Sequence, residues 1–557
     1  MATTPLNPND PLYHLPTAQL SHLRSLFYTQ LAQDKIKPLV LPSAFFGTLF
    51  LPLLYLSLPH KTRPWLYSAR WLVAAAVLYI NHHHLLATTS GSNVAVAYAV
   101  GLIACHGTVW ALTVVVFTRP QWDAARVVKD TKMGGYYEWE FYPEGGGTCW
   151  WGRVRWAGDL LLNFRCVGWN YAVGTIPSPP FPVVGRGGEI GGGGRQRQRV
   201  EMEKMPVVTG QGYYICETTG EFVRDRVWHV VWSWVVIDVW TTFGRGDPYI
   251  VLGPEYVHSS HYKINSLPPG LEGLPRGVVS LGRSFLGITG VAAGLFYFHS
   301  IYQLVNYCVL GKGGLDVLGV QGELWQYPSL FGGFGMVRDK GLGGFWGGWW
   351  HQTFRRGFSA AGEWAFDVVT TGETVPALRV RDTGGMNGKY DNDKERRARK
   401  PTRAKTAVTV LIAFFLSGLM HACGGLTSMS PTTKFWTPIL FFVAQGVGVL
   451  VQGFVCQYFR GFIDRTFSPR WRRVGNLVIV AVWLQLTGWG LVDDMSRAGI
   501  WLFEPVPFSP VRWLVKVLGY GDMLGGNNAN VWRLDEEYGL RWWWGRGGRW
   551  WESGLRL

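Results

Sequence analysis

Apolar stretches alternate with polar segments along the whole chain. A bilayer core of about 30 Å needs about 20 helical residues, because each residue of an α-helix rises about 1.5 Å. Six stretches meet this length with few charges: 38–58, 93–117, 285–310, 406–428, 435–458 and 475–493. Three weaker stretches carry charged residues or prolines: 65–80, 227–243 and 499–518. The pattern predicts an all-α polytopic membrane protein with six to nine transmembrane helices.

The same pattern divides the chain into five regions. They are a polar and amphipathic N-terminal segment (1–37), N-terminal transmembrane helices (38–117), a polar loop region (118–226) with a low-complexity part (178–199), a membrane core (227–518) with a basic loop (379–405), and a C-terminal tail (519–557). Residues 17–34 place leucines and one phenylalanine on a single helical stripe. A helix lying on the membrane and an ordinary packed helix both fit this stripe.

Composition supports a membrane protein and argues against soluble domains or disorder. Charged residues make up 16% of the 557 residues, whereas globular chains average about 25%. The formal net charge is +16, and much of the excess lies in loops beside apolar stretches. This placement indicates an anionic membrane face and not nucleic acid. The N-terminus has no basic segment followed by an apolar one, so no cleaved signal peptide is expected and the first span acts as the membrane signal.

Two basic loops predict the orientation. Residues 379–405 contain ten Lys and Arg against four Asp and Glu, and residues 459–474 contain five Arg against one Asp. Two spans separate these loops, so both loops lie on one side, which the positive-inside rule makes cytosolic. The connector SMSPTT (428–433) between those spans carries no charge and is expected in the lumen. The protein is therefore expected to cross the membrane several times. The expected membrane is that of the endoplasmic reticulum.

No metal site or disulfide framework is indicated. The seven cysteines form no Cys-x-x-Cys pair. The histidine triplet 82–84 follows a weak span, and we expect it in a loop and not at a metal. The glycine run in 188–199 lacks the Lys-Ser or Lys-Thr of a phosphate-binding loop. No bound cofactor is therefore expected.

His421 is the first candidate for chemistry, because it lies inside a strong span. It follows Lys405 by sixteen residues, which places it about 24 Å into the membrane, in the lumenal half. An ionisable residue at such a depth marks a functional site or a structural hydrogen bond between helices. Burial keeps an imidazole neutral, which is the state that a general base needs. His106 and His229 have the same argument in a weaker form and are interpreted as structural.

Residues 341–358, GLGGFWGGWWHQTFRRGF, form the second candidate. The segment is too rich in glycine for a lipid-facing span, and irregular backbone at membrane depth is tolerated where it lines a protein or water cavity. Tryptophans can form the wall of a cavity, His351 and Gln352 can polarise a carbonyl, and Arg355 and Arg356 can pair with phosphate. An interfacial aromatic belt with arginines reaching for water explains the same composition.

Three motifs together resemble a known family. The sequences FWGGWWHQ (345–352) and SGLMH (417–421) are similar to the two signatures of wax-synthase-like membrane-bound O-acyltransferases. The sequences RWAGDLL (155–161) and RCVGW (165–169) resemble a third stretch found in fungal members. The order of the motifs fits, and the resemblance covers about 155–493. The family usually has two basic residues where this chain has Gly348 and Trp349, so a phosphate contact made there must move.

The resemblance implies transfer of an acyl group from acyl-CoA, as co-substrate, to a hydroxyl of a lipophilic acceptor. His421 is expected to act as the general base and His351 to assist at the thioester, both facing one internal tunnel beside a re-entrant or interfacial Trp/Gly-rich segment. Trp346, Trp350 and Gln352 are expected to contact substrate, and the phosphate contact is expected to move to Arg355 or Arg356.

The acyl chain and the acceptor stay open at this point. Similarity to fungal members favours acetyl-CoA and a terpenoid or other hydroxylated secondary metabolite. A long-chain wax ester synthase is the alternative. A transporter of a lipophilic or anionic solute is less favoured, because the broken Gly/Trp-rich helix occurs once and has no counterpart in a second half. The sequence does not indicate an oligomeric state.

Overall fold

The computed structural model describes residues 15–91, 93–130, 135–144, 150–180, 198–245, 247–254, 273–312, 322–375, 402–430, 432–520, 531, 541–543 and 553–556. Parts of three predicted regions lie outside these ranges. They are most of the low-complexity part 178–199, the basic loop 379–405 up to residue 401, and most of the C-terminal tail 519–557.

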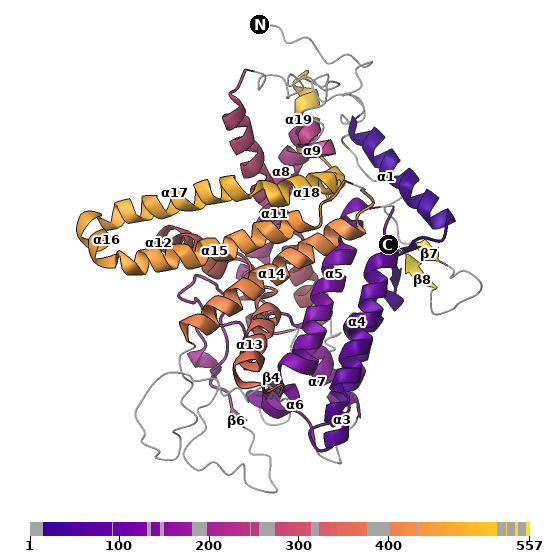
Figure 1. Cartoon of the computed structure of the whole chain (residues 1–557), viewed down its shortest axis with the longest axis vertical. Coiled ribbons are helices and arrows are strands. Elements are labelled where there is room, and N and C mark those ends of the chain that lie inside the picture. The colour runs from indigo at the N-terminus through magenta and orange to yellow at the C-terminus, as the bar shows by residue number, and fades with distance from the viewer. Residues whose placement is uncertain are drawn as a thin grey trace.

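Helices dominate the described chain (Figure 1). Those before residue 260 are α1 (Leu15–Ala32), α2 (Leu51–Ser57), α3 (Pro64–Ser68), α4 (Arg70–Ala87), α5 (Val94–Leu112), α6 (Pro120–Asp123), α7 (Trp150–Leu162), α8 (Thr219–Gly244) and α9 (Pro248–Leu252). Those after it are α11 (Arg276–Leu304), α12 (Gly335–Gly344), α13 (Arg355–Thr371), α14 (Arg403–Thr427), α15 (Trp436–Tyr458), α16 (Arg460–Thr466), α17 (Pro469–Thr487), α18 (Trp489–Arg497) and α19 (Pro510–Val517).

Short elements extend or join these helices. The π-helices are η2 (Phe46–Phe50), η3 (Thr113–Phe117), η5 (Val305–Gly311) and η7 (Phe345–Trp349), and the 3₁₀ turns are η1 (Ser43–Phe45), η4 (Met202–Lys204), η6 (Leu324–Gln326) and η8 (Ile500–Leu502). The strands are β1 (Lys37–Pro38), β2 (Val40–Leu41), β3 (Thr88–Thr89), β4 (Ala125–Asp130), β5 (Tyr136–Phe141), β6 (Gln198–Arg199), β7 (Arg541–Trp543) and β8 (Gly554–Arg556). Strand β2 pairs with β8, so segments from near the two ends of the chain lie side by side.

The region 118–226 contains more ordered structure than the polar loop expected from the sequence. Strands β4, β5 and β6 form an antiparallel sheet in which Val127 pairs with Trp139. Alternate residues of β4 point into a small core, as the two-residue period of a strand requires. Helix α7 buries Trp156 against α2 and α5, and its Asp159 accepts a 3.1 Å bond from the buried Arg126. The motif RWAGDLL thus serves packing.

Four helices in the described part are long and apolar enough to cross a membrane. They are Val94–Phe117, Gly277–Gly311, Arg403–Thr427 and Trp436–Tyr458. The number becomes five if α17 and α18, bent by 45° at Gly488, form one broken span. Four predicted stretches therefore correspond to helices of sufficient length: 93–117, 285–310, 406–428 and 435–458. The predicted number of six to nine spans is higher than the four or five found in the described residues.

Two of the six strong stretches are not continuous spans. The stretch 38–58 begins with the short strands β1 and β2, and its helical part is Ser43–Ser57. Pro38 and Pro42 lack the backbone N–H that a continuous helix needs, so the helix begins after them. The stretch 475–493 is interrupted at the bend between α17 and α18.

The three weaker stretches fall in helices that do not pass the same test of length and apolarity. Helix α4 covers much of 65–80, α8 covers 227–243, and the stretch 499–518 is divided between η8 and α19. The loop expected at the histidine triplet 82–84 is wrong, because α4 continues to Ala87. Backbone hydrogen bonds carry a helix past the end of its apolar stretch, which hydropathy alone does not detect.

Helix α1 confirms the predicted amphipathic helix at 17–34. Leu23, Phe27 and Leu31 are buried, and Leu23 packs in a cluster with Val94 and Val251. The apolar stripe therefore contacts the rest of the protein, as the packed-helix alternative predicts.

Helix α14 is central to the packing, and its neighbours approach it at glycines. A methyl group added at Gly101 of α5 would lie 1.9 Å from the carbonyl oxygen of Cys423 on α14. A methyl group at Gly418 of α14 would lie 2.6 Å from the Cα of Ile439 on α15. Small residues at such crossings let two helix backbones pack closely, which is how helices associate within membranes. Gly418, part of the SGLMH motif, therefore sets the distance between α14 and α15.

Candidate active site

Two antiparallel helices bring the two histidine motifs together. Lys405 at the start of α14 forms an ion pair with Asp367 near the end of α13, in which Nζ donates a 2.5 Å hydrogen bond to Oδ1. Further along, Gly362 of α13 faces the backbone of Thr409. Because α13 runs back along α14, the residues just before α13 lie beside the later turns of α14. A chain of ring contacts accordingly links His351 to His421. His351 contacts Trp350, Trp350 contacts Trp346, and Phe442 lies against both Trp346 and His421.

The Trp/Gly-rich segment is a broken helix. Gly341 has φ +57° and ψ −133°, so α12 is kinked there, and the π-helix η7 follows. The side chain of Gln452 on α15 occupies the kink, and its Oε1 accepts a 2.8 Å bond from the backbone N–H of Leu342. A methyl group at Gly341 would lie 2.1 Å from Gln452 Nε2, so this position requires glycine. The irregular backbone expected here is present and is satisfied by a neighbouring helix.

Gln352 braces this segment from within. It is 3% exposed, and its amide nitrogen donates to the carbonyl oxygens of Trp346 and Trp350 at 2.9 and 2.5 Å. Its Oε1 accepts a 2.8 Å bond from Arg355. Both amide hydrogens are thus used by the protein, so Gln352 holds the backbone of its own segment.

Tyr213 supports the same turn from outside. Its hydroxyl donates a 2.9 Å bond to the carbonyl oxygen of Trp350. Burial raises the pKa of Tyr213 to about 12, so the hydroxyl keeps its proton and remains a donor at neutral pH.

The two expected tryptophans form an apolar wall. The indole N–H of Trp346 donates a 3.3 Å bond to Oε1 of the fully buried Gln445 on α15. The ring of Trp346 packs against Phe442, with 5.9 Å between centroids. Trp350 stacks on Phe345 at 5.7 Å with an interplanar angle of 14°. The indoles are therefore held in fixed orientations.

His351 follows this wall directly. Its ring lies 5.5 Å from that of Trp350 and 5.8 Å from that of Phe354. Neither ring nitrogen has a hydrogen-bond partner in the described part of the chain, and Nδ1 is buried. The side chain has an intermediate accessibility.

His421 shares this property. Protein surrounds the imidazole on α14, yet the residue keeps an intermediate accessibility. One face of the ring stacks on Phe442, with 4.9 Å between centroids. Its Nδ1 lies 3.3 Å from the hydroxyl of Tyr98, and its Nε2 has no hydrogen-bond partner among the described residues.

The two arginines expected to bind phosphate differ. Arg355 is exposed, and it donates to the carbonyl oxygen of Gly347 and to Gln352, so it braces the segment. Arg356 lies over the ring of Tyr171 at 4.4 Å. Its Nε and Nη2 are buried and have no hydrogen-bond partner within the described ranges. A buried guanidinium with unused donors suits an anion, which makes Arg356 the better candidate.

Three further residues were missed by the sequence argument. Arg165, within the motif RCVGW, donates to the carbonyl oxygens of Pro328 and Ser329. Arg226 donates a 3.0 Å bond to the carbonyl oxygen of Tyr327. The Nε2 atom of His299 is buried and has no hydrogen-bond partner in the described structure. Since His299 lies in the predicted span 285–310, the depth argument applied to His421 also applies to it.

The two histidines interpreted as structural lie outside this group of contacts or at its edge. His106 is buried among Phe164, Phe354 and Phe358. His229 lies one helical turn after Asp225, with 3.4 Å between Nδ1 and the carboxylate.

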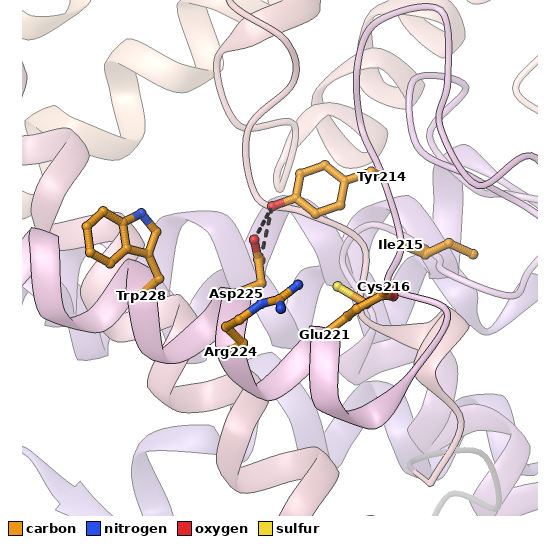
Figure 2. A pocket seen from close by; sticks show the side chains of 7 residues that line it. All are labelled: Tyr214, Ile215, Cys216, Glu221, Arg224, Asp225 and Trp228. Atoms are coloured by element: carbon orange, nitrogen blue, oxygen red, sulfur yellow. Dashed lines mark hydrogen bonds between the residues drawn. The ribbon is translucent and has the colours of Figure 1, made fainter.

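A separate open pocket of about 510 Å³ lies at the start of α8 (Figure 2). The Tyr214 hydroxyl donates to both carboxylate oxygens of Asp225 across it, each at 3.0 Å, and Glu221, Arg224 and Trp228 also line it. Its charges are of both signs, and no residue of the predicted site lines it. The backbone carbonyl of Tyr214 accepts a 2.8 Å bond from the backbone N–H of Ser329, whose own carbonyl accepts a bond from Arg165.

The fold and these residues define an integral membrane protein in which ring contacts connect histidines from separate segments of the chain. Residues 327–444, which include both histidine motifs, match the model of the membrane bound O-acyl transferase family. The family predicted from the motifs is thereby confirmed for this part of the chain.

One curated relative is O-Mevalon transferase macI of Penicillium terrestre, which is 22% identical over 355 residues. The alignment covers 60% of this chain and 62% of that relative, so the chain matches less than two thirds of the relative's length. No solved structure matches this chain.

Proposed function

We propose that this protein is an acyl-CoA-dependent O-acyltransferase that esterifies a hydroxyl of a lipophilic acceptor. The observation that carries the proposal is the chain of ring contacts that links His351 to His421 through Trp350, Trp346 and Phe442. It lies within the part of the chain that matches the acyltransferase family.

His421 acts as the general base through Nε2, because Nδ1 already faces Tyr98. It takes the proton of the acceptor hydroxyl as the oxygen attacks the thioester carbon. The new C–O bond forms, the C–S bond breaks, and the thiolate of CoA leaves and takes up the proton from His421. A positioned base of this kind contributes typically about 10²–10⁴-fold to the rate.

His351 donates from its ring N–H to the thioester oxygen. That oxygen gains negative charge in the tetrahedral transition state, and a donor in a water-poor site stabilises this charge strongly. The absence of protein partners on both ring nitrogens within the described chain leaves the donor free for substrate. No covalent intermediate with the enzyme is required.

Arg356 binds a phosphate of the acyl-CoA. Its unpaired buried donors support this role, and Arg355 is assigned to bracing because its bonds are used. Trp346 and Trp350 form the wall beside the acyl chain, and Phe442 separates Trp346 from His421.

The donor and the acceptor are proposed as acetyl-CoA and a terpenoid or other hydroxylated secondary metabolite, with the endoplasmic reticulum as the membrane. The name of the fungal relative, an O-mevalon transferase, supports the transfer of a group to an oxygen atom. A long-chain wax ester synthase is the alternative.

Membranes from cells that express the chain test the proposal. They are incubated with acetyl-CoA or a long-chain acyl-CoA and a panel of terpenoid and fatty alcohols, and esters are detected by mass spectrometry. Membranes with the His421→Gln variant, at equal amounts of inserted protein, are the control. Ester formation from neither donor, with no release of CoA, would contradict the proposal, and preference for the long-chain donor would select the alternative.

A further inference from the structure

Tyr98 provides the hydrogen-bond contact of His421 in the described structure. The hydroxyl of Tyr98 on α5 lies 3.3 Å from Nδ1 of His421 on α14, and Tyr98 is 2% exposed. The two rings lie 6.3 Å apart between centroids. This contact joins two predicted spans, through residues that are 323 positions apart in the sequence.

A neutral imidazole carries its proton on one nitrogen, and the partner of that nitrogen decides which one. If Nδ1 carries the proton, the lone pair on Nε2 is free to accept the proton of a substrate hydroxyl. If Nε2 carries it, the free lone pair is on Nδ1, where Tyr98 blocks access. Phe442 covers one face of the ring, so the ring has little freedom to turn over.

We propose that Tyr98 is a positioning residue that accepts the Nδ1–H of His421 and thereby holds the tautomer with a free lone pair on Nε2. This inference rests on the proposed function, because it concerns the base of that reaction. Tyr98 touches neither donor nor acceptor and acts through His421.

The packing of α5 on α14 fixes Tyr98 in this position. A methyl group at Gly424, one turn after His421, would lie 2.7 Å from the Tyr98 ring, so glycine leaves room for the ring. Thr427 Oγ1 accepts a 2.9 Å bond from the N–H of Gly101 and donates a 2.8 Å bond to the carbonyl oxygen of Ala97. These two contacts flank Tyr98 on α5 and hold the helix in register with α14.

Asp494 favours the required direction of the Tyr98 hydroxyl. The carboxylate is 1% exposed, and its Oδ1 accepts a 2.8 Å bond from the backbone N–H of Lys434. Its Oδ2 is buried without a hydrogen-bond partner in the described ranges. It faces Gly425 of α14, the residue after the Gly424 that faces the Tyr98 ring. A negative charge nearby attracts the hydroxyl hydrogen, which leaves an oxygen lone pair for the Nδ1–H of His421.

The experiment is the Tyr98→Phe variant, which keeps the ring and removes the oxygen. We expect kcat to fall about 10- to 100-fold, because a misoriented base loses alignment with the substrate, while the KM for acyl-CoA stays unchanged. Tyr79→Phe is the matched control, since Tyr79 lies on α4 and is 74% exposed. Amounts of inserted protein and thermal stability are measured for both variants.

A second variant links the three residues. Asp494→Asn should lower kcat by less than Tyr98→Phe, and it should cause little further loss when added to Tyr98→Phe, because its effect passes through the missing hydroxyl. Full additivity of the two losses contradicts that part of the inference.

An unchanged kcat for Tyr98→Phe overturns the inference, and so does a loss that comes with an equal rise in KM or with loss of inserted protein. Failure of the proposed function gives a different result, since the unaltered protein then forms no ester from either donor, or His421→Gln retains the normal rate. If His421→Gln loses activity and Tyr98→Phe keeps full activity, the proposed role of Tyr98 is rejected and the role of His421 as the base is retained.

Discussion

The imidazole of His421 stacks on the ring of Phe442, with centroids 4.9 Å apart and planes inclined by 10°. Trp346 packs against the same phenylalanine at 5.9 Å. Phe442 is on α15, so a helix outside both motifs places the indole wall beside the proposed base. The two motifs are therefore joined through a shared aromatic contact.

Replacing His421 with glutamine should remove the base and leave the fold. Glutamine keeps polarity and much of the volume beside Tyr98 and Phe442, so insertion and acyl-CoA binding should persist. We expect a loss of about 10²-fold or more in acyl transfer, measured with labelled acyl-CoA in membranes and normalised to inserted protein. His82→Gln on the exposed side of α4 is the control. Near-normal turnover would leave His421 as a helix-contact residue.

His351→Ala should lower the rate with a smaller effect on acceptor binding. The variant loses the donor to the thioester oxygen but keeps the Gln352 bonds that brace the segment. We expect a fall of about 10²-fold in kcat, with a moderate rise in the acyl-CoA requirement. Steady-state kinetics over a range of acyl-CoA concentrations measures both. If the rate and the dependence on acyl-CoA are unchanged, the segment is an interfacial aromatic belt.

Arg355 and Arg356 should respond differently to replacement by glutamine. Arg356→Gln removes buried donors that have no protein partner in the described chain, so the KM for acyl-CoA should rise about 10-fold. Arg355→Gln removes bonds to Gly347 and Gln352, so it should lower thermal stability more than it changes the KM. Titration of both variants with acyl-CoA makes each the control of the other. Equal changes in the KM for acyl-CoA in the two variants would contradict the assignment of the phosphate contact to Arg356.

Gly418→Val should disrupt the active site without touching either histidine. The closest atoms to a methyl group at Gly418 belong to the backbone of α15, at 2.6 Å, and backbone cannot move aside without shifting the helix. Overpacking of this kind costs about 1–3 kcal/mol and would separate Phe442 from His421. Thermal unfolding, monitored by size-exclusion chromatography, should show the loss of stability. Gly453→Val on α15, where nothing lies within 4 Å, should retain wild-type stability.

The hairpin of α14 and α15 should have its connector in the lumen. Thr432 in the connector is exposed, and Gly461 in α16 is exposed with open space around it. A cysteine at position 432 should react with an impermeant maleimide after the lumen is opened. A cysteine at position 461 should react from the cytosolic side. Both are placed in a background whose reactive native cysteines are replaced by serine. The reverse pattern would overturn the depth assigned to His421.

Local sequence properties were sufficient to predict the helices at 93–117, 406–428 and 435–458. Length and apolarity are local quantities, and a bilayer requires both. The motifs around His351 and His421 also indicated the family, because each consists of neighbouring residues. The same local argument failed at 38–58 and 475–493, where strands and a bend interrupt apolar sequence.

Only the tertiary structure decided how the site is built. Sequence placed Gln352 beside His351 as a possible substrate contact, and folding used its amide to hold the backbone of its own segment. Tyr98 lies in an apolar span, where no local sequence pattern marks it. The crossing of α5 on α14 brings it to His421. Hydropathy and motif order depend on residues near one another in the chain. Hydrogen bonds such as that of Tyr98 depend on helix crossings set by glycine contacts hundreds of residues apart.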